Sequence, residues 1–176
     1  MINYIKKELN RLGTLKHIGK TIIEKFLKRM DKDKRLIKEE NPTNHFCCFF
    51  LPFHKQTGLI YLVDHIKGRD WMPPGGHIER NEFPQETVKR EFLEELNYKL
   101  TNEKIELFDI SVKRINKPKQ VCKIHYDLWH LVYVEKINFV YDKKEFYRAS
   151  WLSIEEGLQL IKTVKYNDIV KKLLSF

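Results

Sequence analysis

Residues 75–96 read GGHIERNEFPQETVKREFLEEL, and the second half of this stretch has the apolar spacing of an α-helix. Three apolar residues recur on one helical face: Val88, Phe92 and Leu96. Glu91, Glu94 and Glu95 cover an adjacent arc, so their carboxylates would project into one small volume. Like charges at this spacing cost a helix roughly 0.2–0.5 kcal/mol per pair. The repulsion indicates either a solvated acidic edge or a site that needs several carboxylates.

The residues at both ends of this segment predict where the helix begins and ends. Pro84 suits the first helical position, which makes Phe83 the N-cap. Glu86 then stands where a capping-box acid accepts a hydrogen bond from the Phe83 N–H, although Phe83 itself has no capping oxygen. Asn97 follows, and asparagine is second only to glycine as a left-handed C-cap. We therefore expect a helix over residues 84–96.

Two glycines precede the helix and follow two prolines, in the order Pro73, Pro74, Gly75 and Gly76. Glycine lets other groups approach the backbone closely, so a carbonyl oxygen here can face the carboxylates. Carboxylate and carbonyl oxygens together form the ligand set that suits Mg2+ or Mn2+ rather than Zn2+. In the alternative interpretation the glutamates form an exposed acidic edge offset by basic neighbours: Lys89, Arg90 and Lys99.

The spacing of the charged residues resembles the signature of the Nudix hydrolases, G-x5-E-x7-R-E-U-x-E-E-x-G-U, in which U is a bulky apolar residue. The matching residues are Gly76, Glu82, Arg90, Glu91, Phe92, Glu94 and Glu95. Asn97 and Tyr98 depart from the pattern, where the family has a glycine and an aliphatic residue. The resemblance implies an α/β (α+β) fold in which a mixed β-sheet lies between helices, an α/β/α sandwich.

The same resemblance implies Mg2+-dependent hydrolysis of a nucleoside diphosphate linked to another moiety, with Mn2+ as the alternative cofactor. Glu91 and Glu95 would be the leading metal ligands. Glu94 would be a further ligand or an acid that contacts the ligands without binding the metal itself. A backbone ligand would come from the carbonyl of Gly75 or Gly76. Divalent cations neutralise phosphate oxygens and lower the pKa of bound water, so carboxylates that hold them suffice for most of this chemistry.

Three further roles follow from the resemblance. Arg90 would orient a carboxylate, either that of Glu82 or that of Glu94. The general base would be Glu94 or Glu145, and Glu145 could equally be a solvated acid in a charged run. His77 follows the glycines and is a candidate for substrate contact; the simpler interpretation is a loop histidine held by a backbone hydrogen bond.

Residues outside the signature select the substrate. Markers of the ADP-ribose and dinucleoside-polyphosphate branches are absent downstream of the signature, where the chain holds Lys113, Arg114 and Ile115 instead. This region favours a small-molecule nucleotide, either a nucleoside triphosphate or a nucleotide conjugate, over ADP-ribose. A pyrophosphohydrolase of RNA 5′ ends and a nucleotide-sensing domain without turnover also fit the sequence.

The first forty residues lie outside the resemblance, so we expect an N-terminal helical extension over residues 1–40 and a Nudix domain over residues 41–176. Residues 1–40 contain twelve Lys and Arg against six Asp and Glu, a net +6 of the chain's +9. Two groups of apolar residues recur at helical spacing: Ile2, Ile5, Leu9 and Leu12, then Ile18, Ile22, Phe26 and Met30. We expect these stripes to dock on the catalytic domain or on a second subunit of a homodimer. Cationic amphipathic segments also bind nucleic acid or membrane surfaces, which is the alternative.

The rest of the chain is expected to form strands followed by helices. The expected strands are 45–52 and 59–64, joined as a hairpin, and 105–115 and 121–134, separated by a loop with Asn116 and Pro118. Ser153 and Glu156 form a capping box that opens a helix through Leu160. Asn167 is expected to begin a further helix.

The cysteines and histidines give no simple metal motif. The three cysteines are Cys47, Cys48 and Cys122. Their spacing fits neither a disulfide pattern nor a metal motif, which indicates buried thiols in a reducing compartment such as the cytoplasm. No apolar stretch reaches membrane-spanning length. In the pattern H-x-D-x-x-H, alternation puts His130 on the opposite strand face from His125 and Asp127, so we expect no metal site shared by all three.

Overall fold

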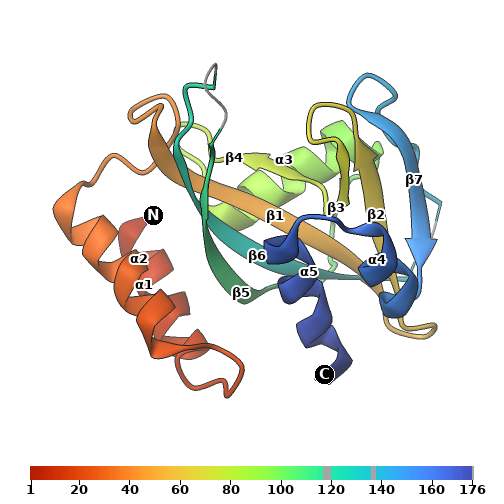
Figure 1. The fold of residues 1–176 in the computed structure, drawn as a ribbon, viewed down its shortest axis with the longest axis horizontal. Coiled ribbons are helices and arrows are strands. Elements are labelled where there is room, and N and C mark those ends of the chain that lie inside the picture. Colours follow the sequence, from red (N-terminus) through yellow and green to blue (C-terminus); the bar gives the residue numbers. More distant parts are fainter. Residues whose placement is uncertain (117–119, 136–137, 176) are drawn as a thin grey trace.

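A mixed β-sheet forms the centre of the computed structural model, which describes residues 1–116, 120–135 and 138–175 (Figure 1). Within these residues the strands are β1 (Asn44–His54), β2 (Leu59–His65), β3 (Asp70–Met72), β4 (Gly75–His77), β5 (Ile105–Arg114), β6 (Ile124–Val134) and β7 (Phe146–Leu152). The main order is β3-β2-β1-β6-β5, with β4 paired to β1 and β7 paired to β2.

Strand β1 organises the sheet because it pairs with three others. It runs parallel to β6 along its whole length and antiparallel to β2 and β4. Its sequence, NHFCCFFLPFH, is a nearly continuous apolar run, and almost every residue in it is buried. Such a run is typical of a strand that is covered on both faces. The predicted hairpin of β1 and β2 is confirmed.

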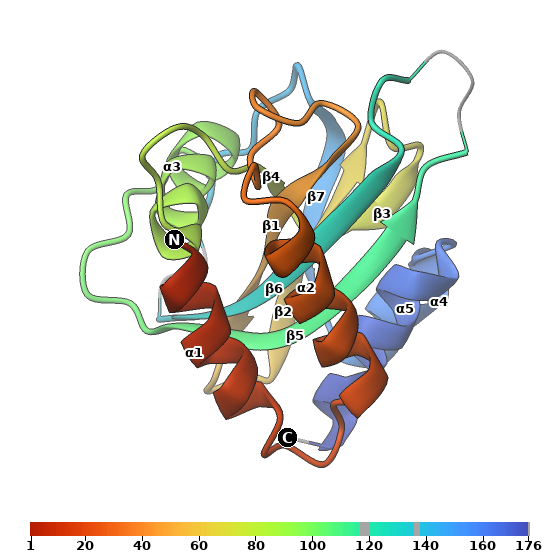
Figure 2. The same cartoon turned by 90° about the vertical axis from the view of Figure 1, so that its left-hand side faces the viewer.

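Helices cover both faces of the sheet, as the resemblance implied. They are α1 (Ile2–Leu12), α2 (Lys20–Lys32), α3 (Pro84–Leu96), α4 (Ile154–Leu160) and α5 (Val164–Lys171). Figure 2 shows the sheet between α3 on one side and the pair α4 and α5 on the other, with α1 and α2 lying across β5 and β6. The predicted α/β/α arrangement is therefore confirmed.

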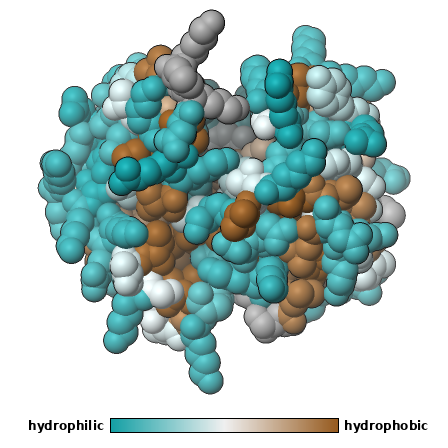
Figure 3. All heavy atoms as spheres, viewed as in Figure 1, coloured by the Kyte–Doolittle hydropathy of each residue, from teal (hydrophilic) through white to brown (hydrophobic). Residues whose placement is uncertain are grey.

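The N-terminal helices bury their apolar stripes in the core of the sheet domain. Leu9 and Leu12 of α1 and Phe26 and Met30 of α2 have no exposed surface. Phe26 packs edge-on against two aromatic rings, those of Phe46 in β1 and Tyr126 in β6. The expected docking on the catalytic domain is thus confirmed. Figure 3 shows a largely hydrophilic face with apolar side chains gathered between these helices and the sheet and around α5.

Side chains from the N-terminal segment contact backbone carbonyl groups on the outer edge of β5. A β-bulge interrupts the pairing of β5 with β6 between Leu107 and Asp109. The Arg11 guanidinium donates a hydrogen bond to the Leu107 carbonyl, and the His17 ring lies 3.1 Å from the Phe108 carbonyl oxygen. Unpaired strand edges invite association with other strands, so these contacts protect the sheet.

The observed strands differ from the sequence prediction in several places. Strand β6 begins at Ile124 rather than at residue 121, because its partners Asn44 and Arg114 are the terminal residues of β1 and β5. Strands β3, β4 and β7 were not predicted. The predicted Pro118 loop residue lies outside the described residues.

The last helix begins at Val164, so the prediction that Asn167 opens it was wrong. Asp70 accepts hydrogen bonds from the backbone N–H groups of Lys162 and Thr163, both at 2.8 Å. A carboxylate from β3 therefore holds the N-cap residue and the residue before it, which is a long-range contact that local sequence does not reveal. The Asn167 side chain instead donates to the Leu158 carbonyl. None of the described helices has the length and apolarity that crossing a bilayer requires.

Candidate active site

Helix α3 is held rigidly, and this fixes the position of its glutamates. The Glu86 carboxylate accepts a hydrogen bond of 2.7 Å from the Phe83 N–H, and Asn97 closes the helix in the left-handed conformation with φ 48° and ψ 39°. Both predicted caps are confirmed. The residues of the predicted apolar stripe, Val88, Phe92 and Leu96, are fully buried. Phe92 stacks on Phe50 of β1 at 5.0 Å between ring centroids, so the acidic face of α3 turns toward β4.

The two glycines allow β4 to lie against both β1 and α3. Gly75 has a φ of 148°, and a Cβ atom on it would lie 2.2 Å from the Cys48 carbonyl oxygen. A Cβ atom on Gly76 would lie 1.9 Å from Glu91 Oε1. A side chain at Gly75 would clash with the backbone of β1, and a side chain at Gly76 would displace the Glu91 carboxylate, so glycine at both positions permits the observed placement of Glu91.

Glu95 is the most deeply buried acid of the helix. Only 5% of its surface is exposed, and its Oε2 atom has no hydrogen-bond partner among the described residues. Burial raises the pKa of this carboxyl well above its usual range, and the negative charges of Glu91 and Glu145 raise it further. A buried carboxylate with an unsatisfied oxygen is costly unless a cation or a proton neutralises it.

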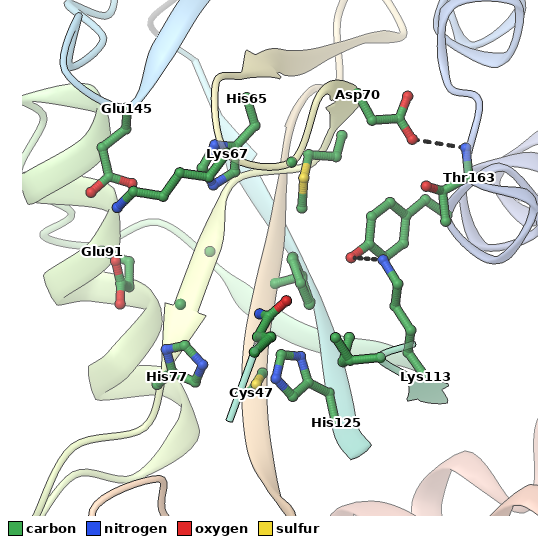
Figure 4. Close-up of a pocket in the computed structure, with 18 of the residues that line it drawn as sticks. Cys47, His65, Lys67, Asp70, His77, Glu91, Lys113, His125, Glu145 and Thr163 are labelled. Carbon is green, nitrogen blue, oxygen red and sulfur yellow. Dashed lines mark hydrogen bonds between the residues drawn. The ribbon is translucent and has the colours of Figure 1, made fainter. Parts of the chain in front are cut away.

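Glu91 and Glu145 complete an acidic group around Glu95. Burial also raises the pKa of Glu91, while hydrogen bonding and charge from Arg90 oppose that rise. Glu145 comes from the loop before β7, which is tied to the end of α3 by a 2.8 Å hydrogen bond from the Asp142 N–H to the Glu95 carbonyl. Glu145 and Glu91 lie on the same wall of the cavity (Figure 4).

Arg90 connects the signature residues to one another. Its guanidinium makes two hydrogen bonds to Glu82, from Nε at 2.7 Å and from Nη2 at 3.1 Å. It also donates to Glu91 at 2.8 Å and to Glu94 at 3.1 Å. A further bond of 2.9 Å reaches the His77 carbonyl on β4. Arg90 therefore contacts both carboxylates that the sequence offered as alternatives.

Glu82 and Glu94 lie outside the cavity that the described residues form. Burial disfavours the charged form of Glu82, but hydrogen bonds from Arg90, the Glu79 N–H and Thr87 outweigh this and lower its pKa. The Glu94 side chain is 58% exposed and contacts Arg90. These positions suit residues that orient Arg90, and through it Glu91.

Arg90→Lys should lower kcat by about 100-fold, because a single ammonium cannot span Glu82, Glu91 and the His77 carbonyl, and small displacements of catalytic groups carry penalties of that order. Steady-state kinetics with Mg2+ would measure the effect. Arg80→Lys is the matched control, since Arg80 is exposed and pairs with Glu39 at the surface. Equal kcat values for Arg90→Lys and wild type would show that the Arg90 guanidinium does not contribute to catalysis.

The acids line one wall of a cavity of about 610 Å3. The cavity is also lined by basic and aromatic residues that were not predicted as site residues: Phe49, Lys38, Lys67, Lys113, Arg114 and Tyr166. In Figure 4, Lys113 lies across the cavity from Glu91 and Glu145, whereas Lys67 extends toward Glu145. The Lys113 ammonium donates to the Tyr166 hydroxyl at 2.7 Å, which fixes both side chains at the cavity wall (Figure 4). The cavity thus has an acidic wall and, across from it, a basic wall that includes Lys113, an arrangement that suits a phosphate chain bound through a cation.

His77 lies in β4 rather than in a loop, and its ring is part of the cavity wall. Burial lowers the pKa of this ring to about 3, and the charge of Lys38 and the rings of His45 and His125 lower it further. The imidazole is therefore neutral at physiological pH. The His77 carbonyl accepts a hydrogen bond from Arg90.

Comparison with known proteins gives a clear family assignment. A family model of the NUDIX domain matches residues 42–173. Similar solved structures include Escherichia coli dihydroneopterin triphosphate pyrophosphohydrolase, with a TM-score of 0.65 and 13% identity over 74% of this chain and 96% of that chain. Caenorhabditis elegans Ap4A hydrolase gives a TM-score of 0.60 and 16% identity over 74% and 96% of the two chains. The MutT protein of Bacillus halodurans gives 0.56 and 20% over 76% and 82%.

A comparison with curated protein sequences gives no match. At these low identities the solved structures show a shared fold, whereas the family model matches the sequence itself over most of its length. The charged signature residues also meet around one helix and one glycine strand, with Arg90 in contact with four of the groups involved. The chain therefore belongs to the Nudix family of hydrolases.

Proposed function

We propose that this protein is a Mg2+-dependent pyrophosphohydrolase that cleaves a nucleoside triphosphate or a nucleotide conjugate, with Mn2+ as the alternative cofactor. The observation that carries the proposal is the buried Oε2 atom of Glu95, which has no hydrogen-bond partner in the described part of the chain and lies with Glu91 and the Gly76 backbone on the acidic wall of the cavity. An all-oxygen group of this kind suits a hard divalent cation.

The residues fit such a cation in both charge and space. Glu91 and Glu95 would supply carboxylate oxygens, and Gly75 or Gly76 would supply a carbonyl oxygen. The opening that a Cβ atom on Gly76 would fill lies directly beside Glu91 Oε1. When bound, Mg2+ would neutralise the phosphate oxygens and lower the pKa of a coordinated water molecule.

The basic wall of the cavity would bind the substrate. Lys38, Lys67 and Lys113 can pair with the phosphates, and the Phe49 ring offers an apolar surface for a nucleobase. Two of the structural neighbours are named for dihydroneopterin triphosphate and for Ap4A, which supports a substrate with a chain of phosphates. We propose that His77, which also lines the cavity, contacts the substrate.

Glu145 is the better candidate for the general base, because it lines the cavity beside Glu91 and Glu95 whereas Glu94 points to solvent. Glu145→Gln should lower kcat by about 100-fold or more, the range typical of a lost general base, with Mn2+ affinity little changed. Glu94→Gln should lower kcat less than about tenfold. The reverse ranking, measured at saturating Mg2+, would assign the base to Glu94.

The proposed function is tested by incubating the protein with nucleoside triphosphates, dinucleotides, ADP-ribose and nucleotide sugars in Mg2+ or Mn2+. Mass spectrometry of products formed in 18O-labelled water identifies the phosphorus that is attacked. Release of pyrophosphate or of a nucleoside monophosphate from a small nucleotide is the expected result. Preference for triphosphorylated RNA 5′ ends would favour the RNA alternative, and binding of nucleotides without any turnover would contradict the proposal.

A further inference from the structure

Three histidines and a cysteine converge at one end of the cavity. They are His45 at the start of β1, His77 in β4, Cys122 just before β6 and His125 in β6. One potential ligand atom from each residue lies within 4.8 Å of the others. The three imidazole rings are 4.9–5.6 Å apart between centroids. In Figure 4, His77 and His125 lie close together at the end of the cavity away from Asp70 and Glu145.

Strand pairing produces this convergence. His45 and His125 are direct partners in the parallel pairing of β1 with β6. His77 is paired with Cys47, two residues after His45, in the antiparallel pairing of β1 with β4. The Lys123 N–H donates to the Thr43 carbonyl at 2.8 Å, which holds the preceding Cys122 beside β1. The cluster thus depends on the rigid centre of the sheet.

The polar atoms of the cluster are poorly satisfied by protein groups. The Nε2 atoms of His77 and His125 are buried and have no hydrogen-bond partner among the described residues. His45 has no exposed surface and Cys122 only 4%. Each buried polar group without a partner costs about 1–3 kcal/mol. Ordinary packing of neutral imidazoles around a thiol would leave that cost uncompensated.

The arrangement of His45 matches that of a metal ligand. Its Nδ1 atom lies 3.0 Å from the Asn41 carbonyl oxygen, which directs Nε2 toward the cluster. That Nε2 atom is 3.7 Å from the Cys122 sulfur. With Zn–S of about 2.3 Å and Zn–N of about 2.0–2.1 Å, a tetrahedral site separates sulfur and nitrogen ligands by about 3.6 Å.

We propose that His45, His77, His125 and Cys122 bind a Zn2+ ion in a tetrahedral site that is separate from the oxygen site on α3. Imidazole nitrogens with one thiolate suit Zn2+, whereas the carboxylates of Glu91 and Glu95 suit Mg2+. The Cys122 thiol would lose its proton to solvent on binding. His77 and His125 line the cavity, which provides a route of entry for the ion.

The site would stabilise the strand that shapes the catalytic cavity. His77 directly follows Gly76, and its carbonyl accepts the hydrogen bond from Arg90. A metal bound to the His77 ring would therefore link β4 to β1 and β6 on the side opposite the helix. Its role in this arrangement is structural, because four protein ligands leave no open position for substrate.

A second set of residues competes for His125. The ligand atoms of Cys47, His125 and Asp127 also lie within 4.8 Å of one another. Asp127 already accepts a 3.0 Å hydrogen bond from the Ser111 hydroxyl, and this set has three ligands rather than four. We therefore favour the set with Cys122, and the cysteine variants separate the two.

Titration of tag-free, metal-free protein with Co2+ tests the proposal without nucleotide or activity. In wild type, a sulfur-to-cobalt charge-transfer band and the intense visible bands of tetrahedral Co2+ should saturate at one equivalent, and excess Zn2+ should remove both. Cys122→Ser should lose the charge-transfer band and at least about 100-fold in affinity, more than is typical for loss of a second-shell group. Cys47→Ser is the matched buried-thiol control and should keep the band.

Two results would overturn the zinc site. One is a wild-type titration without tetrahedral bands, which needs no variant and so is independent of any folding defect. The other is a band that survives Cys122→Ser and disappears in Cys47→Ser, which would assign the metal to the set with Asp127. Glu95→Gln should bind Co2+ at this site as wild type does, so loss of the proposed hydrolase activity would leave this result unchanged.

Discussion

Glu95→Gln should lower kcat by about 1,000-fold or more, equivalent to roughly 4 kcal/mol of transition-state stabilisation, while the protein stays folded. The substitution keeps the shape of the side chain and removes the charge that would hold the cation. Because Glu95 is buried next to Glu91 and lies near the negative charge of Glu145, neutralising it should not reduce the Tm measured in EDTA. Steady-state kinetics and thermal unfolding measure the two effects.

Glu155→Gln is the matched control, since Glu155 is exposed on α4 and remote from the carboxylates of α3. It should match wild type in both kcat and Tm. Mg2+ should raise the Tm of wild type and of the control but not that of Glu95→Gln, because a ligand that binds only the folded state stabilises it. Full activity in Glu95→Gln would exclude Glu95 as a ligand.

Deleting residues 1–40 should yield aggregated or unfolded protein, although the family match begins only at residue 42. The deletion would expose core side chains of the sheet and leave the Leu107 and Phe108 carbonyls on the β5 edge without Arg11 and His17. An exposed strand edge beside apolar surface promotes association between chains. Size-exclusion chromatography and circular dichroism of the truncated protein measure the outcome.

A point substitution tests the same packing in the full-length chain. Phe26→Ala should lower the free energy of unfolding by about 3–5 kcal/mol, since Phe26 is fully buried against Phe46 and Tyr126. Lys25→Ala, at the adjacent exposed position, should change it by less than about 0.5 kcal/mol. A soluble, active and monomeric truncated protein would show that residues 1–40 are an accessory arm.

Helix α3 and its caps could be predicted from the sequence because their determinants are local. The spacing of Val88, Phe92 and Leu96, the capping position of Glu86 and the C-cap role of Asn97 all lie within one short segment, and each is confirmed. The role of the two glycines was likewise predictable, because a residue without a side chain permits the close approach of the Glu91 carboxylate seen at Gly76.

The features that the sequence did not reveal depend on contacts between distant segments. The basic wall of the cavity combines side chains from β5 and α5, such as Lys113 and Tyr166. No local sequence pattern predicts that these two residues contact each other. The start of α5 is set by Asp70, and the His and Cys cluster is assembled by the pairing of β1 with β4 and β6. The spacing of residues along the chain does not predict these contacts between distant segments.

The most direct test of the oxygen site is a crystal of the full-length protein soaked in Mn2+ with a non-hydrolysable nucleoside diphosphate analogue. Anomalous scattering locates the ion independently of any assay. We predict a manganese peak between the carboxylates of Glu91 and Glu95 and the carbonyl of Gly75 or Gly76, with phosphate oxygens completing its coordination. A map that shows the analogue bound in the cavity and no manganese at these carboxylates would contradict the account.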